Sequence, residues 1–162
     1  MRRDSSPIET LEPVYVSPHE SATARTPAHV VAILLGAGFL AITAIGVVSP
    51  GFLGAHLSMT HNLIHLLSGC ASLYFGLFGT VSGARLFCIL FAIVYGGLAV
   101  AGFAMGGAGE HTVADVSHGH DSLLLRVVPG KFEVALSDHL IHTVIASVYL
   151  VAGILTRPRR RP

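Results

Sequence analysis

Charged residues are scarce in this chain of 162 residues. Only 12% of the residues are charged and 52% are hydrophobic, whereas a soluble domain carries about 25% charged residues. The few charges lie near the two ends and in one central segment. This distribution argues against an ordinary soluble core and is typical of an integral membrane protein.

Several catalytic and redox signatures are also missing. The sequence has no G-x-S-x-G nucleophile elbow, no phosphate-binding loop and no dinucleotide-binding glycine pattern. Its two cysteines, Cys70 and Cys88, lie within apolar runs and form no C-x-x-C motif. We expect them to be packing residues rather than a redox pair. The sequence therefore gives no basis for assigning an enzyme.

Four apolar runs approach the length of a membrane-crossing helix, which needs roughly 20 residues. We expect such helices at about 30–48, 63–81, 86–105 and 140–156. The runs are continuous rather than alternating, which favours helices over a membrane β-barrel. The predicted fold class is all-α, a four-transmembrane-helix bundle at 28–156 with an outer loop at 106–138.

The two ends of the chain are polar. Residues 1–27 are rich in serine, proline and threonine, and they separate Arg2 and Arg3 from the first apolar run. We therefore expect a disordered tail rather than a signal peptide. Residues 157–162 read RPRRRP. This basic tail suits a stop-transfer anchor, with anionic lipid headgroups as the alternative role.

The basic residues predict the orientation. Arginines before the first helix, at Arg85 between the second and third, and after the fourth all fall on one side of a four-helix topology. Only Arg126 and Lys131 fall on the other side. The positive-inside rule then predicts a bacterial cytoplasmic membrane protein with both termini in the cytoplasm.

A histidine motif occurs twice. HNLIHLLSG contains Asn62 and His65, and DHLIHTVIAS contains His139 and His142. Each copy stands at the start of a predicted helix, which places it near the outer surface. Histidine is costly inside a bilayer, so a matched pair needs a physical reason.

Helical periodicity places both histidines on an inward face. At about 100° per residue, one stripe of the second helix contains only small or polar residues, namely His61, His65, Ser68, Ser72, Gly76 and Gly79. The fourth helix repeats this stripe with Asp138, His142, Ala146, Tyr149 and Gly153. Small and polar residues face other helices rather than lipid. We therefore expect His65 and His142 to point into the bundle.

The similarity extends weakly to the preceding helices, at LAITAIG (40–46) and LAVAGFA (98–104). Each unit would then be one outward helix followed by one inward helix. The prediction is two tandem helix-pair repeats in the same orientation, related by an axis along the membrane normal. Such an axis would place His65 and His142 opposite each other.

Three short motifs carry a resemblance to a known family. They are N-x-x-H-L at the start of the second helix, A-R-L-F before the third and D-x-x-x-H at the start of the fourth. Together they resemble a bacterial family of small four-helix integral membrane proteins classed as a domain of unknown function. The match covers about 28–156 and is best at Asn62, His65, Gly69, Ala84, Arg85, Leu86 and His142. The chain departs from the family pattern at His139, where the pattern has asparagine. The resemblance implies the fold and the membrane location, and no activity.

The favoured interpretation of the paired histidines is structural. Asn62, His65, Asp138 and His142 would form a polar network that holds the helices together, each hydrogen bond contributing about 0.6 kcal/mol. In this interpretation the chain is a small structural or interaction protein of the membrane. We expect the lipid bilayer as its partner, with a homo-oligomer or another membrane protein as further candidates, and no nucleic acid.

Two alternatives stay open. In one, His65 and His142 ligate a haem b, or His61, His65, His139 and His142 bind zinc or copper. In this alternative the SHGHD stretch at 117–121 is a weak additional metal signal. The other alternative is a proton or solute pathway, because ionisable residues inside membranes often mark one.

Overall fold

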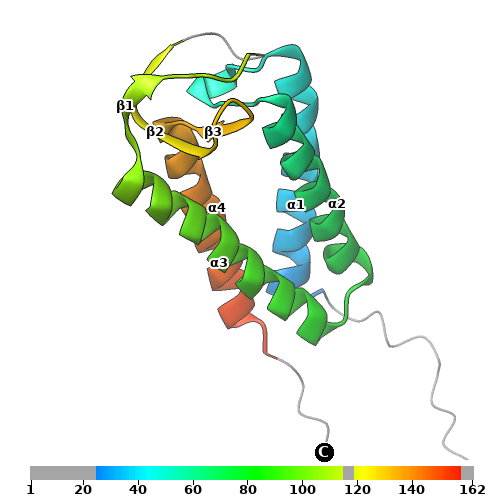
Figure 1. Ribbon diagram of the computed structural model, residues 1–162. Coiled ribbons are helices and arrows are strands. Elements are labelled where there is room, and N and C mark those ends of the chain that lie inside the picture. The colour runs from blue at the N-terminus through cyan, green and yellow to red at the C-terminus, as the bar shows by residue number, and fades with distance from the viewer. Residues whose placement is uncertain (1–24, 115–118, 158–162) are drawn as a thin grey trace, which may run out of the picture.

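The structure is a computed structural model, and it describes residues 25–114 and 119–157 (Figure 1). Its four helices are α1 (Pro27–Val48), α2 (Met59–Phe78), α3 (Val81–Met105) and α4 (Leu136–Leu155). A 3-10 turn, η1 (Phe52–Gly54), lies between α1 and α2. Three strands, β1 (Gly107–Glu110), β2 (His120–Val128) and β3 (Phe132–Val134), connect α3 to α4.

Three of the helices, α1, α3 and α4, are long and apolar enough to cross a membrane. The composition and these helices indicate a membrane protein. The helix α2 has 20 residues but falls short in hydropathy, because one of its faces carries polar residues such as His61, Asn62 and His65. It packs along α1, which is apolar enough to span (Figure 1).

Local sequence determines where the helices begin and end. Pro27 occupies the first position of α1, where its missing N–H costs nothing, and Pro50 follows the end of the same helix. The Thr80 hydroxyl accepts a hydrogen bond of 3.0 Å from the Gly83 N–H and so caps α3. Because Gly79 is the only other residue between α2 and α3, these two helices are joined by a tight turn.

The helices pack as two close pairs, α1 with α2 and α3 with α4, and contacts between the pairs are fewer (Figure 1). Glycines allow the close approach in both pairs. A Cβ added at Gly76 would lie 2.7 Å from Ile33 Cγ1, and one at Gly153 would lie 2.8 Å from Ile89 Cγ1. Small residues at such contacts are the usual means of helix association in membranes.

Aromatic and hydroxyl side chains join the two pairs at the centre. The rings of Phe39 and Tyr95 lie 5.2 Å apart, and the hydroxyls of Ser72 and Tyr149 share a hydrogen bond of 2.7 Å. All four side chains are buried. The prediction that the polar stripes of the second and fourth helices face inward is confirmed for His61, His65, Ser72 and Gly76 and for the five α4 residues.

A small antiparallel sheet in the order β1-β2-β3 covers one end of the helices (Figure 1). Leu124 pairs with Gly107 on one side of β2, and Arg126 pairs with Glu133 on the other. The all-α prediction was therefore wrong for part of the segment 106–138. The missed signal is Pro129-Gly130 between two apolar runs, since this dipeptide favours a hairpin turn. Gly130 adopts a left-handed φ of 74° there.

All four helices begin earlier than the apolar runs suggested. The structure starts α1 at Pro27, α2 at Met59, α3 at Val81 and α4 at Leu136, where we expected 30, 63, 86 and 140. The first turns of α2 and α4 contain buried polar residues, which interrupt the apolar run without ending the helix. Each histidine motif therefore begins within the first turn of its helix.

Candidate metal centre

Three buried histidines converge where the helices meet the sheet. His61 and His65 come from α2 and His142 comes from α4, and one ligand nitrogen of each lies within 4.8 Å of the others. The side chains are only 1%, 6% and 2% exposed. A tetrahedral zinc ion with Zn–N bonds of about 2.0–2.1 Å would hold its nitrogens roughly 3.4 Å apart. Small side-chain rotations therefore suffice to close this group on an ion.

Aromatic residues from the partner helices position the rings. Phe39 of α1 packs against His65 with ring centroids 5.4 Å apart. Tyr95 of α3 packs against His142 at 5.2 Å. The His61 ring lies 4.4 Å from that of His65 and 6.0 Å from that of His142. Each pair of helices thus presents an imidazole from one helix backed by a ring from the other.

Hydrogen bonding fixes the His61 tautomer. Its Nδ1 lies 2.5 Å from the His56 carbonyl oxygen. A carbonyl oxygen only accepts, so Nδ1 carries the proton and Nε2 keeps its lone pair. Metal-binding histidines are typically oriented in this way, with the second nitrogen donating to a backbone carbonyl.

The rings of His65 and His142 differ from that of His61. The Nδ1 atoms of both are buried and have no hydrogen-bond partner within the described residues. A buried polar group without a partner costs about 1–3 kcal/mol. The site thus contains buried nitrogen atoms that protein groups leave unsatisfied.

Asp138 lies beside the histidines, but its carboxylate accepts hydrogen bonds from backbone N–H groups. Its Oδ2 accepts hydrogen bonds from the N–H groups of Ala135, at 2.7 Å, and His56, at 3.1 Å. No hydrogen bond links Asp138 to His142 in the described parts of the chain, contrary to the predicted network. The carboxylate instead stabilises the start of α4 and holds the His56 backbone, whose carbonyl orients His61.

Asn62 and His139 turn away from the centre. A Cβ at Gly46 would collide with the Asn62 amide, and one at Gly102 would collide with the His139 ring. Asn62 Nδ2 donates to the Leu57 carbonyl at 3.0 Å, and His139 Nε2 bonds to a strand carbonyl at 2.8 Å. The structure therefore separates His139 from the other predicted metal ligands and Asn62 from the predicted network, because each faces a glycine of its partner helix.

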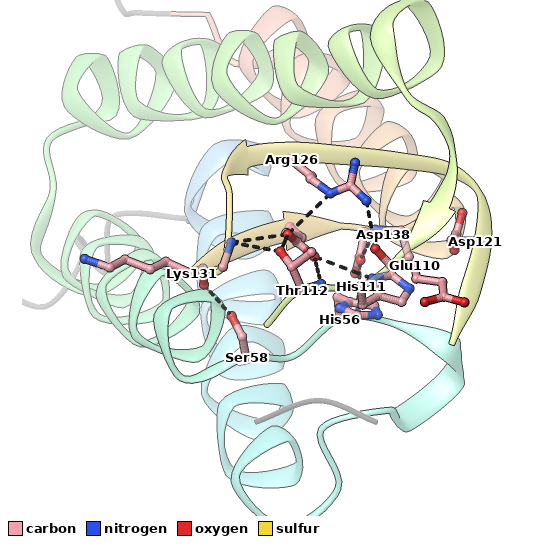
Figure 2. A network of polar contacts seen from close by, with 12 residues as sticks. His56, Ser58, Glu110, His111, Thr112, Asp121, Arg126, Lys131 and Asp138 are labelled. Carbon is pink, nitrogen blue, oxygen red and sulfur yellow. Dashed lines mark hydrogen bonds and ion pairs between the residues drawn. The ribbon is translucent and has the colours of Figure 1, made fainter. Parts of the chain in front are cut away.

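A second histidine pair lies in the layer beneath the sheet. His56 and His111 stack with ring centroids 3.1 Å apart, and Figure 2 shows them beside Asp138. Burial, followed by the neighbouring His111, lowers the pKa of His56 to about 4. Burial also lowers the pKa of His111, with partial compensation from nearby carboxylates. Both imidazoles are thus neutral at physiological pH. Sequence reasoning did not connect these two residues, because they lie in separate connecting segments.

Glu133 of β3 organises this layer. Its carboxylate is fully buried and accepts hydrogen bonds from the Thr112 N–H and hydroxyl and from the Gly130 N–H, while the Arg126 Nε lies 3.6 Å away. Burial alone would raise the pKa of Glu133, but these donors and Arg126 lower it overall. Glu133 therefore stays ionised and fixes the segment that carries His111.

The other histidines within the described residues do not join the centre. Residues 117 and 118 of SHGHD lie outside the described residues, as do His19 and most of both predicted tails. His120 is exposed on β2, and the Asp121 carboxylate accepts from the Leu123 N–H at 2.8 Å. His29 lies at the opposite end of the helices, where its Nε2 bonds to the Gly79 carbonyl at 2.9 Å.

An apolar cavity of about 320 Å³ leads to the histidines. Its only polar lining side chains are those of His65, Asp138 and His142. The remaining walls come from α1, α4 and the segment 52–57. His61 does not line the cavity, so the cavity meets the histidine group from the side of His65 and His142.

No family model, curated protein or solved structure matches this chain.

Proposed function

We propose that this protein is a membrane metalloprotein that binds one divalent transition-metal ion, Zn²⁺ or Cu²⁺, through His61, His65 and His142. The observation that carries the proposal is the group of three buried imidazoles within ligand distance, two of which have unsatisfied ring nitrogens. Imidazole suits both metals. Three nitrogen ligands with an open fourth position resemble the zinc sites at which water or substrate binds.

A bound metal ion explains the geometry better than a structural network of hydrogen bonds does. In a structural network the buried nitrogens would bond to one another or to Asn62 and Asp138. Those two side chains instead bond to backbone groups. A bound ion would satisfy the lone pairs that the protein leaves without partners, and it would offset their desolvation.

A single ion also fits better than haem b. A six-coordinate haem needs two imidazoles on opposite faces of a large ring. Here the His61 ring stands 4.4 Å from the His65 ring and 6.0 Å from the His142 ring. This third imidazole occupies the space beside the pair, where a porphyrin would have to extend.

The proposal places the centre at the outer side of a bacterial cytoplasmic membrane. Arg25, Arg85 and Arg157 lie at the end of the helices opposite the sheet, whereas Arg126 and Lys131 belong to the sheet end. The positive-inside rule then favours cytoplasmic termini and an external sheet. In this arrangement α2 crosses the membrane with its partner α1, its polar face covered by protein.

Matched contacts support the further proposal that the two helix pairs are tandem repeats. Gly76 packs against Ile33 and the His29 carbonyl, and Gly153 packs against Ile89 and the Arg85 carbonyl. Ile33 and Ile89 are 56 positions apart, as are His29 and Arg85, and the glycines are 77 apart.

The same two shifts relate the residues of the metal centre. A shift of 77 relates His65 to His142, and a shift of 56 relates their backing rings, Phe39 and Tyr95. The equivalent contacts support a pseudo-two-fold axis that passes between the two histidines. The repeat proposal accounts for why one ligand comes from each pair at the same helical position.

Metal analysis of the purified protein tests the proposal. The full chain in detergent, loaded with Zn²⁺ or Cu²⁺ and desalted, should retain about one ion per chain, as expected for a single site. His61→Ala, His65→Ala and His142→Ala should each weaken binding by more than about 100-fold, since loss of an outer-shell partner alone costs 10–100-fold. His120→Ala is the matched control, because it removes an exposed histidine.

Two results would contradict the proposal. One is a folded wild-type protein that retains no metal after loading, which would return the histidines to a purely structural role. The other is retention of metal by a folded triple variant. A Soret band in the purified protein would identify haem instead.

A further inference from the structure

The two grooves between the helix pairs differ in whether they reach the histidines. The cavity described above lies between α1 and α4, and its helical walls are Leu35, Gly38, Phe39, Ile42, Ile141 and Ile145. A second cavity, of about 470 Å³, lies between α3 and α2. Its helical walls include Phe91, Val94, Tyr95, Leu98, Ile64 and Ser68. These six residues are the repeat counterparts of the six helical residues that line the first cavity, at the same shifts of 56 and 77 sequence positions. Only the first cavity is lined by His65 and His142.

A hydrogen bond crosses the second groove. Tyr95 donates its hydroxyl hydrogen to Ser68 Oγ at 2.9 Å, which links α3 to α2 across the groove. Phe132 of β3 also lines this cavity and is buried. In the first groove the counterparts of Tyr95 and Ser68 are Phe39 and Ile145, which cannot form this bond.

The first groove is open toward the lipid side of the helices. A Cβ at Gly38 would meet no atom within 4 Å. Ile141, on the opposite wall, is 39% exposed. The turn η1 adds Phe52 and Leu53 to the lining, and Leu53 is 71% exposed. Because α1 and α4 are both apolar enough to cross a membrane, we expect this opening to face hydrocarbon rather than water.

The polarity of the cavity changes along its length. The walls are apolar, and the polar side chains gather at the histidine end, where the Nδ1 atoms of His65 and His142 have no partner within the described residues. Apolar walls favour an alkyl or aromatic tail, since each buried CH₂ contributes to binding. Metal-bound imidazoles and a carboxylate favour a head group with oxygen ligands that also carries a proton to donate.

We propose that the cavity between α1 and α4 admits a membrane-dissolved amphiphile whose oxygen head group takes the open coordination position of the ion. This inference rests on the proposed metal centre and specifies what binds to it. The tail lies between α1 and α4. The head group meets the ion from the side of His65 and His142, and it donates a hydrogen bond to the Asp138 carboxylate.

Octanohydroxamate is a suitable probe, because it combines an eight-carbon chain with two oxygen atoms that ligate zinc and cobalt. Acetohydroxamate has the same head group without the tail. The full-length protein in detergent is loaded with Co²⁺, and binding is followed through the visible absorption of cobalt. Both probes should change the spectrum, and octanohydroxamate should bind at least about tenfold more tightly, because its tail is buried.

Two glycine substitutions distinguish binding of the probe in the cavity from its partition into the detergent micelle. Gly38→Leu fills the first groove, and Gly97→Leu is the matched control in the second groove, where an added Cβ also meets no atom within 4 Å. We expect Gly38→Leu to weaken octanohydroxamate binding about tenfold or more, since the tail loses its apolar contacts. Gly97→Leu should bind octanohydroxamate as tightly as the wild type does. Because the probe partitions into detergent equally in both samples, a difference between the two variants reports binding in the first groove.

The outcomes distinguish the two proposals. A wild-type protein that retains none of Zn²⁺, Cu²⁺ and Co²⁺ overturns the metal centre and, with it, the cavity ligand. Bound cobalt whose spectrum does not respond to octanohydroxamate overturns only the cavity ligand. Equal affinities of the Gly38→Leu and Gly97→Leu variants for octanohydroxamate overturn it as well.

Discussion

The first turns of α2 and α4 occupy equivalent places beside the three-histidine cluster, yet they are stabilised differently. In α2, Ser58 precedes the helix and its hydroxyl accepts from the His61 N–H at 3.2 Å. In α4 the preceding residue is Ala135, and Asp138, three positions on, accepts from the Ala135 N–H. These are the two halves of a capping box, divided between two helices.

This division explains why the cluster contains three histidines rather than four. His61 and Asp138 are counterparts, 77 positions apart. Because Ser58 caps α2, the third position of that helix is free to carry a ligand. Because Ala135 has no side chain that can cap α4, the third position there must serve the backbone. Helix capping and the placement of a histidine in the cluster therefore compete for the third position of the helix.

The largest effect on stability should come from Asp138→Ala. This substitution leaves the N–H groups of Ala135 and His56 without acceptors, and each unsatisfied buried group costs about 1–3 kcal/mol. We expect a loss of about 3 kcal/mol, whereas Ser58→Ala, which removes one cap and the hydrogen bond from its hydroxyl to the Lys131 carbonyl, should cost about 2 kcal/mol. Denaturation of the two variants in the same detergent measures the difference. Equal losses would show that the two caps are energetically alike.

A smaller difference is expected between the glycines of the two helix pairs. A Cβ at Gly76 would lie 2.9 Å from the Ile33 backbone nitrogen, whereas one at Gly153 would lie 2.8 Å from the Ile89 Cγ1 atom and 3.4 Å from the nearest backbone atom. Overpacking costs about 1–3 kcal/mol where the neighbour cannot move. We expect Gly76→Ala to lose about 2 kcal/mol and Gly153→Ala to lose less than about 1 kcal/mol, by the same denaturation assay. The reverse order would place the tighter contact in the second pair.

Removal of the hydrogen bond that crosses the second groove should have a modest effect on stability. Tyr95→Phe makes the groove between α3 and α2 resemble its counterpart at Phe39 and removes the hydrogen bond to Ser68. Interhelical hydrogen bonds in membranes contribute about 0.6 kcal/mol on average. We expect a loss of this size, and it should disappear when Ser68→Ala is already present. Additive losses from the two substitutions would argue against the bond.

A pH effect is also expected at the sheet end, through the two buried histidines His56 and His111. Burial lowers the pKa of His111 below its ordinary value of 6.5. The unfolded chain therefore takes up a proton at that histidine before the folded chain does, and stability should fall as pH drops below 6.5. The groups that act on His111 are Asp121, Glu133 and Asp138, which oppose the shift, and His56 and Arg126, which favour it.

Melting curves between pH 7.5 and 5.5 test this effect, because Glu133, with its lowered pKa, stays ionised throughout that range. His111→Phe keeps a ring against His56 and removes the titrating group. Its stability should depend less on pH than that of the wild type. An unchanged pH dependence would assign the effect to another histidine.

The sequence predicted the features that depend on periodicity. A repeat of polar and small residues every three to four positions was enough to predict that His61, His65 and His142 face inward, because a helix has one angular step per residue. Their convergence also followed from the paired motifs. Residues 30–48 and 86–105 were predicted as helices from apolar length alone, and the structure has helices there.

Features that depend on single contacts were not predictable in this way. His139 has the same periodic position as Asn62, and only the packing of Gly102 against its ring shows that it faces away from the centre. Nothing in the spacing of His56 and His111 indicates that they stack. Glu133 lies in a three-residue strand, too short to show any alternation, so its burial and its donors become visible only in the folded chain.

The backbone of His56 links elements that are distant in the sequence. Its N–H bonds to the first turn of α4, its carbonyl bonds to the His61 ring of α2, and its side chain stacks beneath the sheet. No one of these elements can open locally without breaking a contact to this residue. In native-state hydrogen exchange, the amide protons of His56 and Ala135 should therefore exchange through one shared opening, as members of a single cooperative unit.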